Sequence, residues 1–150
     1  MEQISKNFSM AEFSASATAA SAGILNDIPG NVKPAVRALV SELLQPLCDY
    51  AGWRGKINSG YRSPALNGLV GGVATSQHVR GEAADVVFFR KEGGKTIYIA
   101  SVEVLRVLTA SGLNFDQAIA YNGFVHLSYT TARPNRRQIL YNSFYTGGRI

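Results

Sequence analysis

The longest helical pattern in the chain begins after residue 32, where apolar side chains recur three and four positions apart. The members of this pattern are Val36, Leu39, Val40, Leu43, Leu44 and Leu47. Such spacing places them on one face of an amphipathic helix, which we expect to end before Gly52. Proline lacks a backbone N–H and crowds the preceding turn, so Pro46 is expected to kink this helix.

Two further helices are predicted. Apolar residues at helical spacing cover residues 96–110 and stop at Gly112, a residue type that often ends helices. Ser9 and Glu12 have the spacing of a capping box, which predicts a short helix over residues 10–14. Residues 15–30 are small and polar and predict a loop with room for one helical turn, and residues 90–95 predict an exposed turn.

Shorter patterns predict strands. Residues 56–59 form a strand candidate that leads into a loop at residues 60–64, and residues 84–89 are an apolar run typical of a buried strand. Asn122-Gly123 separates two more strand candidates, residues 116–121 and 124–129, and is a strong hairpin signal for a type I′ turn. Residues 138–141 can add another strand.

A two-residue turn at Asn122-Gly123 fixes how the hairpin pairs. Tyr121 then lies opposite Phe124, and Ile119 lies opposite His126. The alternation of strand side chains assigns one face to Gln117, Ile119, Tyr121, Phe124, His126 and Ser128. Asp116 is predicted on the other face.

These elements predict an α+β fold, an antiparallel-rich sheet with helices packed on one side, as a single domain over residues 1–150. The chain is 46% hydrophobic, enough for a core. No run approaches the roughly 18 apolar residues of a membrane span, so we expect a soluble monomer without stable membrane insertion. The first residues are charged and lack an apolar segment, so we expect synthesis in the cytoplasm without a signal peptide.

The formal net charge of +5 suits an anionic partner such as nucleic acid, a membrane surface or an acidic wall polymer. The one cationic cluster covers residues 133–137 and includes Arg133, Arg136 and Arg137. It is short and lacks the interleaved aromatic residues of a nucleic-acid stripe. We interpret it as a solvated sheet edge and expect no nucleic-acid partner.

Residues 76–85 read Ser-Gln-His-Val-Arg-Gly-Glu-Ala-Ala-Asp and bring a histidine and a carboxylate together among small residues. Imidazole and carboxylate are both good zinc ligands, and a catalytic zinc site takes three protein ligands. Small residues let the backbone turn closely, so Asp85 can approach the ion that His78 binds. The chain has only two histidines, so the third ligand, if it is a nitrogen, must be His126. The alternative is a surface loop that leads into a buried strand.

The motif His78-x-x-Gly81-x-Ala83-x-Asp85, preceded by Ser76 and followed by His126, resembles the zinc D,D-peptidases of bacterial cell walls. That family includes D-alanyl-D-alanine carboxypeptidases, D-Ala-D-Ala dipeptidases of vancomycin resistance and phage endolysins. Other matching stretches lie in the same order, at residues 59–64, 66–67, 70–72, 115–117 and 135–138. The likeness extends over about residues 8–141.

This resemblance implies a hedgehog-like fold and one zinc ion held by His78, Asp85 and His126. It implies hydrolysis of D-amino-acid-containing peptide bonds in peptidoglycan, with Arg62 assisting substrate binding. We also assign Ser76 and Gln77 to substrate binding. For Arg62 the alternative is a structural arginine that bonds loop carbonyls. Action at the cell wall or periplasm would follow phage lysis or another export route.

The family's catalytic glutamate is missing. Alignment through Phe115-Asp116-Gln117 places Tyr121 at its position, and the residue three before His126 is Gly123. We therefore assign catalytic roles to Arg62 and Tyr121, the latter as a hydrogen-bond donor to a developing oxyanion. Two alternatives stay open: a non-catalytic zinc-binding wall or virion-associated module on the same fold, and a basic nucleic-acid-binding domain.

Overall fold

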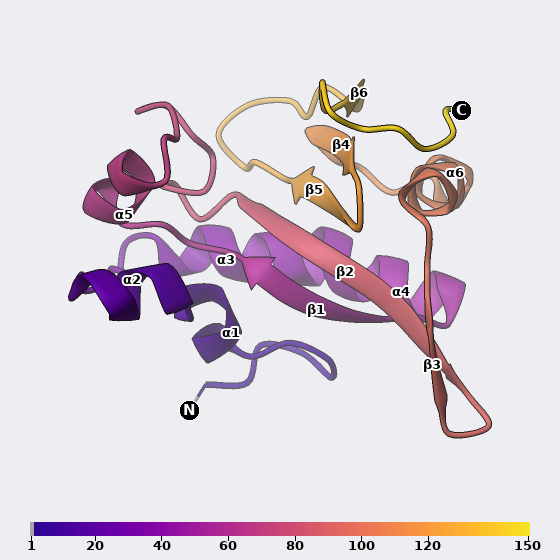
Figure 1. Ribbon diagram of the computed structural model, residues 1–150, viewed down its shortest axis with the longest axis horizontal. Coiled ribbons are helices and arrows are strands. Elements are labelled where there is room, and N and C mark those ends of the chain that lie inside the picture. The colour runs from indigo at the N-terminus through magenta and orange to yellow at the C-terminus, as the bar shows by residue number, and fades with distance from the viewer. Residues whose placement is uncertain (1) are drawn as a thin grey trace.

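A computed structural model describes residues 2–150 as an α+β structure built on one six-stranded mixed sheet (Figure 1). The strands are β1 (Arg54–Ser59), β2 (Ala83–Glu92), β3 (Lys95–Tyr98), β4 (Gln117–Tyr121), β5 (Phe124–Ser128) and β6 (Gln138–Tyr141). Their order is β1-β2-β5-β4-β6, and β3 pairs with β2. All pairings are antiparallel except that of β4 with β6. The predicted fold class is confirmed.

The helices are α1 (Met10–Ser14), α2 (Ala17–Ala22), α3 (Lys33–Leu39), α4 (Gln45–Ala51), α5 (Pro64–Leu69) and α6 (Ser101–Ser111). A π-helical turn at Val40–Leu44 joins α3 to α4. There the Gln45 amide donates to the Val40 carbonyl, five residues back. Pro46 follows directly and has no amide to offer, so the helix changes its hydrogen-bonding pattern where the sequence predicts a disturbance.

Helices α3, α4 and α6 supply much of the core. Their buried leucines and valines join a single cluster with the inward residues of the sheet. Along β4 and β5 these inward residues are Ala118, Ala120, Val125 and Leu127. Figure 1 shows α3 and α4 behind β1 and β2. The intervening positions of β4 and β5, which include His126, are therefore left for the opposite face.

The hairpin of β4 and β5 has the predicted register. Tyr121 pairs with Phe124, and Ile119 pairs with His126. The turn type differs from the prediction, because a type I′ turn needs positive φ at both central residues and only Gly123 has it, at 89°. The Asn122 side chain is held by the C-terminal segment, where it donates to the Phe144 carbonyl.

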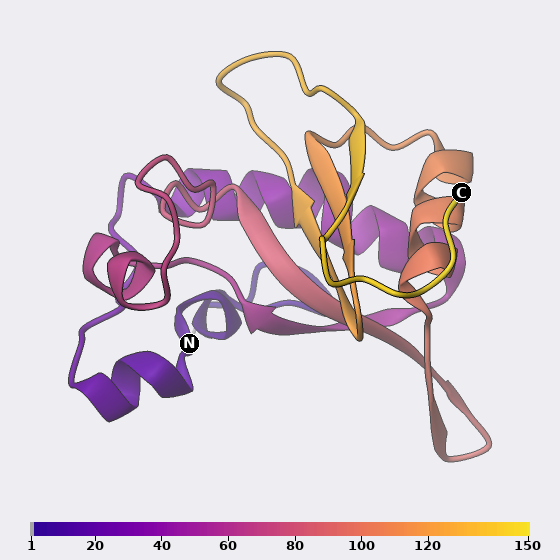
Figure 2. The ribbon, with the colours of Figure 1, turned by 45° about the horizontal axis from the view of Figure 1, so that its top comes forward.

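Three segments are more regular than the sequence predicts. Residues 17–22 form α2, and Pro64, the last residue of the expected loop at residues 60–64, begins α5. The expected helix over residues 96–110 starts only at Ser101. Residues 95–98 instead form β3, and the predicted turn is the tip of a β2–β3 hairpin that projects from the body (Figure 2). Positive φ at Gly93 and Gly94 allows this reversal.

Among residues 2–150, no helix has both the length and the apolar content needed to cross a membrane.

Candidate metal centre

The three predicted zinc ligands meet at one point. Strands β2 and β5 pair so that Asp85 lies directly opposite His126. The His126 Nδ1 is 3.0 Å from the Asp85 Oδ1, and the His78 Nε2 is 3.5 Å from the same oxygen. One ligand atom from each residue lies within 4.8 Å of the other two. Sheet register thus sets two ligands, and a loop brings the third.

That loop depends on Gly81. Its φ is +72°, a left-handed conformation that side chains disfavour. An added Cβ would also lie 2.6 Å from the Val32 Cγ1, on the approach to α3. The Gly81 amide donates back to the His78 carbonyl. The missing side chain therefore lets the loop turn against α3 and start β2 at Ala83, as the motif predicts.

His78 is oriented by its second ring nitrogen. Its Nδ1 lies 2.7 Å from the Gly60 carbonyl oxygen, which can only accept a hydrogen bond. The Nδ1 therefore carries a proton, and the Nε2 is the ring nitrogen that faces Asp85 and His126 and is left to bind a metal. A histidine that donates one nitrogen to a carbonyl and offers the other to a metal is the usual arrangement in metal sites.

The donor set fits zinc. In a tetrahedral site each ligand lies about 2 Å from the ion, which separates neighbouring ligand atoms by roughly 3.3 Å. The distances of 3.0 and 3.5 Å from Asp85 to the two histidines lie on either side of this value. The residues present could therefore hold one zinc ion with three protein ligands.

The Asp85 carboxyl is held ionised. Burial alone would raise its pKa, but hydrogen bonds from His126 and His78, together with the nearby imidazole charge, bring the pKa well below its usual range. Asp85 thus offers a carboxylate, the protonation state that a metal ligand requires.

A cavity of about 330 Å³ opens beside these three residues. It is lined by all four remaining residues to which the sequence assigns roles: Arg62, Ser76, Gln77 and Tyr121. It is also lined by residues that the sequence analysis did not assign: Val73, Thr75, Arg80, Gln117, Ile119 and Arg136. For Gln117 and Ile119 a signal existed, because the hairpin register places both on the face of His126.

Arg62 faces the metal centre rather than loop carbonyls. Its Nη2 is 3.8 Å from the Asp85 Oδ2, and its Nε and Nη1 lie 3.3 and 3.4 Å from the Ser59 and Asn67 side-chain oxygens. These contacts are long for hydrogen bonds to a guanidinium. The Arg62 side chain therefore keeps donor capacity for a ligand in the cavity.

Tyr121 lines the same cavity and stacks on Phe124, with ring centroids 4.5 Å apart. Burial raises the pKa of its phenol, and the charge of Asp85 raises it further. The hydroxyl is therefore protonated at neutral pH, so it can donate a hydrogen bond but is a poor general base.

Neither of the two other acids near the motif can replace the missing glutamate. Glu82 accepts from Thr130 and Arg80, at 2.8 and 3.1 Å, and does not line the cavity. Asp116 is fully buried and, as the hairpin register predicts, faces away from His126. Of the cavity-lining residues, Asp85 alone carries a carboxylate.

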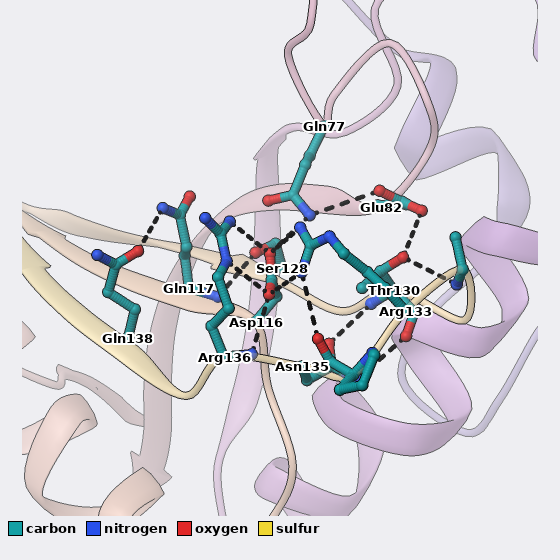
Figure 3. A network of polar contacts seen from close by, with 12 residues as sticks. Gln77, Glu82, Asp116, Gln117, Ser128, Thr130, Arg133, Asn135, Arg136 and Gln138 are labelled. Atoms are coloured by element: carbon teal, nitrogen blue, oxygen red, sulfur yellow. Dashed lines mark hydrogen bonds and ion pairs between the residues drawn. The ribbon is translucent and has the colours of Figure 1, made fainter.

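The cationic cluster at residues 133–137 is exposed, as the sequence predicts, but two of its arginines also bind a buried carboxylate. Arg133 and Arg136 each grip the buried Asp116 carboxylate with two guanidinium nitrogens, at 2.8 to 3.0 Å (Figure 3). Hydrogen bonds from Arg133 outweigh the effect of burial and, with those from Arg136, hold the pKa of Asp116 far below its usual range. The cluster neutralises a core carboxylate, since a buried charge needs a partner.

Gln77 connects this cluster to the loop that carries His78. Its Nε2 donates to Asp116 at 3.0 Å and lies 3.4 Å from Glu82 (Figure 3). Ser76 accepts a hydrogen bond from the His78 amide at 3.2 Å. Both residues precede His78 and line the cavity.

One of two comparisons with known proteins found a match. No curated protein matches the chain. The family model described as Peptidase M15 matches residues 6–128, which include all three candidate ligands. The match covers most of the 150 residues. The chain therefore belongs to the peptidase M15 family.

Proposed function

We propose that this protein is a zinc peptidase that hydrolyses D-amino-acid-containing peptide bonds in the stem peptides of peptidoglycan. Its family is zinc-dependent, and its structure contains a possible His-Asp-His metal site. The observation that carries the proposal is the meeting of His78, Asp85 and His126 at the wall of a cavity that Arg62 also lines.

In this function each cavity residue has a separate task. A zinc ion bound by the three ligands would polarise the scissile carbonyl and lower the pKa of a water molecule. Arg62 would bind the free carboxylate of the peptide, for which a planar guanidinium is well suited. Tyr121, protonated and beside Asp85, would donate a hydrogen bond to the oxyanion.

A second candidate is a non-catalytic zinc-binding module that recognises the cell wall. One observation favours it: no carboxylate other than the predicted ligand Asp85 lines the cavity, so the site offers no acidic general base. Loss of a general base typically costs about 10²–10⁴ in rate. The two candidates share the metal site and differ in turnover.

Zinc analysis of the purified protein, followed by incubation with a D-Ala-D-Ala-terminated stem peptide, tests the proposal. We expect about one zinc per chain and release of an amino acid or peptide that chelation abolishes. Zinc without hydrolysis would favour the binding module, and absence of zinc would contradict both candidates.

Substitution of Tyr121 separates the two candidates further. Tyr121→Phe should lower turnover by about 10²–10³ with unchanged zinc affinity, because one oxyanion donor is lost. Tyr121→Glu should raise activity, since it restores a base on the face that His126 occupies. An active wild type that Tyr121→Phe leaves unaffected would reduce Tyr121 to a packing residue of the hairpin.

Arg62→Lys tests carboxylate recognition. Lysine keeps the charge but loses the planar fork, so use of a peptide with a free C-terminal carboxylate should fall more than use of its amide. Rates for both peptides would be measured in parallel. Equal losses would return Arg62 to a structural role.

A further inference from the structure

The cavity holds an excess of positive charge. Three arginines line it, while Asp85 is its one acidic lining residue. Arg80 is balanced by Glu82, whose Oε1 lies 3.1 Å from the Arg80 Nε. Arg62 lies near Asp85 and serves the proposed carboxylate site. The third arginine, Arg136, has no role in the proposed function.

Arg136 is fixed from behind by Asp116. Its Nε lies 3.0 Å from Oδ1, its Nη2 lies 2.8 Å from Oδ2, and its backbone amide donates to Oδ1 at 3.0 Å (Figure 3). Arg133 binds the same carboxylate through both Nη atoms. One negative charge thus faces two positive charges, and the group of three keeps a net charge of +1.

The outer edge of this guanidinium is available. Among residues 2–150 no hydrogen-bond partner accompanies the Arg136 Nη1, and the side chain is 49% exposed at the cavity wall. Because Asp116 already holds the planar group in one orientation, a ligand that binds the outer edge loses little side-chain entropy. An arginine fixed in this way is suited to a carboxylate.

Gln77 provides a neighbouring acceptor. Its Nε2 faces two carboxylates, Asp116 at 3.0 Å and Glu82 at 3.4 Å, and a carboxylate can only accept. The amide orientation is therefore determined, and the Gln77 Oε1 is left for a donor such as a peptide N–H. The wall near Arg136 thus combines an anion site with a peptide-backbone acceptor.

We propose that Arg136 binds a second carboxylate of the substrate, apart from the terminal one at Arg62, and that Asp116 positions Arg136 for this contact. The inference rests on the proposed function in taking the substrate to be a stem peptide. The preferred ligand is then a stem peptide whose inner acidic residue carries a free carboxylate rather than a carboxamide.

Calorimetric titration of zinc-loaded protein with two hydrolysis-resistant stem peptides tests this inference. The peptides differ only in that one inner carboxylate is amidated in the second. Wild type should bind the carboxylate form about tenfold more tightly, or better, as expected for a hydrogen bond between charged groups. Arg136→Gln should remove this preference and leave affinity for the amidated peptide unchanged.

Arg106→Gln is the matched control, because it removes the same charge from α6, outside the cavity, where Arg106 pairs with Glu103. The control should keep the wild-type preference. A preference below about twofold in wild type, or an equal loss for both peptides in Arg136→Gln, would overturn the role of Arg136. Should Arg136→Gln not fold, Arg136→Lys and the wild-type peptide pair decide the question.

Asp116→Asn tests the positioning role. In folded protein the preference between the two peptides should fall severalfold while zinc content stays at the wild-type level. An unchanged preference would show that Asp116 is structural only. These binding results are independent of turnover: an inactive protein that prefers the carboxylate peptide contradicts the peptidase function but supports Arg136, and an active protein without preference does the reverse.

Discussion

Asp85 and Asp116 are two buried carboxylates with lowered pKa values and opposite surroundings. Asp85 lies between two imidazoles at 3.0 and 3.5 Å and opens onto the cavity. Asp116 has no exposed surface and is bound by two guanidinium groups, one amide side chain and one backbone N–H. A neutral imidazole can bind a metal, whereas a guanidinium group stays protonated and remains paired with the carboxylate.

These surroundings distinguish a candidate metal ligand, Asp85, from a residue that orders its neighbours, Asp116. A candidate metal ligand needs neighbours that can also bind the ion and a side open to the cavity, and Asp85 has both. Asp116 has all its lone pairs occupied, so its ionisation serves the arrangement of Arg133, Arg136 and Gln77 around it. The direction of a pKa shift alone would not distinguish these roles, because both shifts are downward.

The largest expected effect is on metal binding. Asp85→Asn, His78→Ala or His126→Ala should each weaken zinc affinity by more than about 100-fold, because a three-ligand site cannot lose one. Zinc content after dialysis measures this. Asp116→Asn is the control and should retain about one zinc per chain, so metal loss in that variant would erase the distinction between the two carboxylates.

The next effect is on stability. Asp116→Asn leaves two arginines without their anion in a buried network and should lower the free energy of unfolding by about 3 kcal/mol. This is the lower end of the range for broken buried pairs, because both arginines are half exposed. Urea denaturation of zinc-free protein measures the loss. Glu92→Gln, which breaks an exposed ion pair with Arg90, should change stability by less than about 0.5 kcal/mol.

The smallest effect is on the pH dependence of stability. The folded-state pKa of Asp116 lies below the unfolded value of about 3.9, so its contribution is complete well above that value and is lost as the pH falls through and below it. The stability gap between wild type and Asp116→Asn should therefore be widest near neutral pH and narrow below about pH 4. A constant gap from pH 7 to pH 3 in chelated protein would contradict this assignment.

The candidate metal ligands were predictable because the chain contains few histidines. With two histidines, few ligand sets were possible, and the two-residue turn at Asn122-Gly123 fixed the face on which His126 lies. Neither the histidine count nor the hairpin turn predicts which residue pairs with Asp85 in the sheet. Its position opposite His126 depends on the pairing of β2 with β5, residues about 40 apart, which local periodicity does not encode.

The roles of Arg133 and Arg136 were missed for the same reason, although a signal was present. The hairpin register placed Asp116 on the face away from His126, which is the core face. A buried carboxylate there needs a cationic partner. The nearest cationic cluster along the chain was at residues 133–137, so joining the two observations would have predicted the pairing.

At β3 the prediction was wrong because an apparent helical spacing was followed over a segment that forms a strand. Ile97 and Ala100 fitted the helical spacing that continues through Val104, and this spacing favoured a single long helix. Residues 96–99 are β-branched or aromatic, a composition typical of strands. The Gly93-Gly94 turn lets this segment fold back on β2, and local strand preference then prevails over the apparent period.

Part of the positive charge of the chain lies on the projecting β2–β3 hairpin, away from the cavity. Among residues 2–150, strand β3 pairs only with β2, so its other edge presents unpaired backbone groups to solvent (Figures 1 and 2). Lys91 and Lys95 lie near the exposed tip. Two copies that approached along this edge would bring like charges together, which is how native proteins discourage the addition of foreign strands. These lysines thus place positive charge beside an unpaired sheet edge, apart from the cavity.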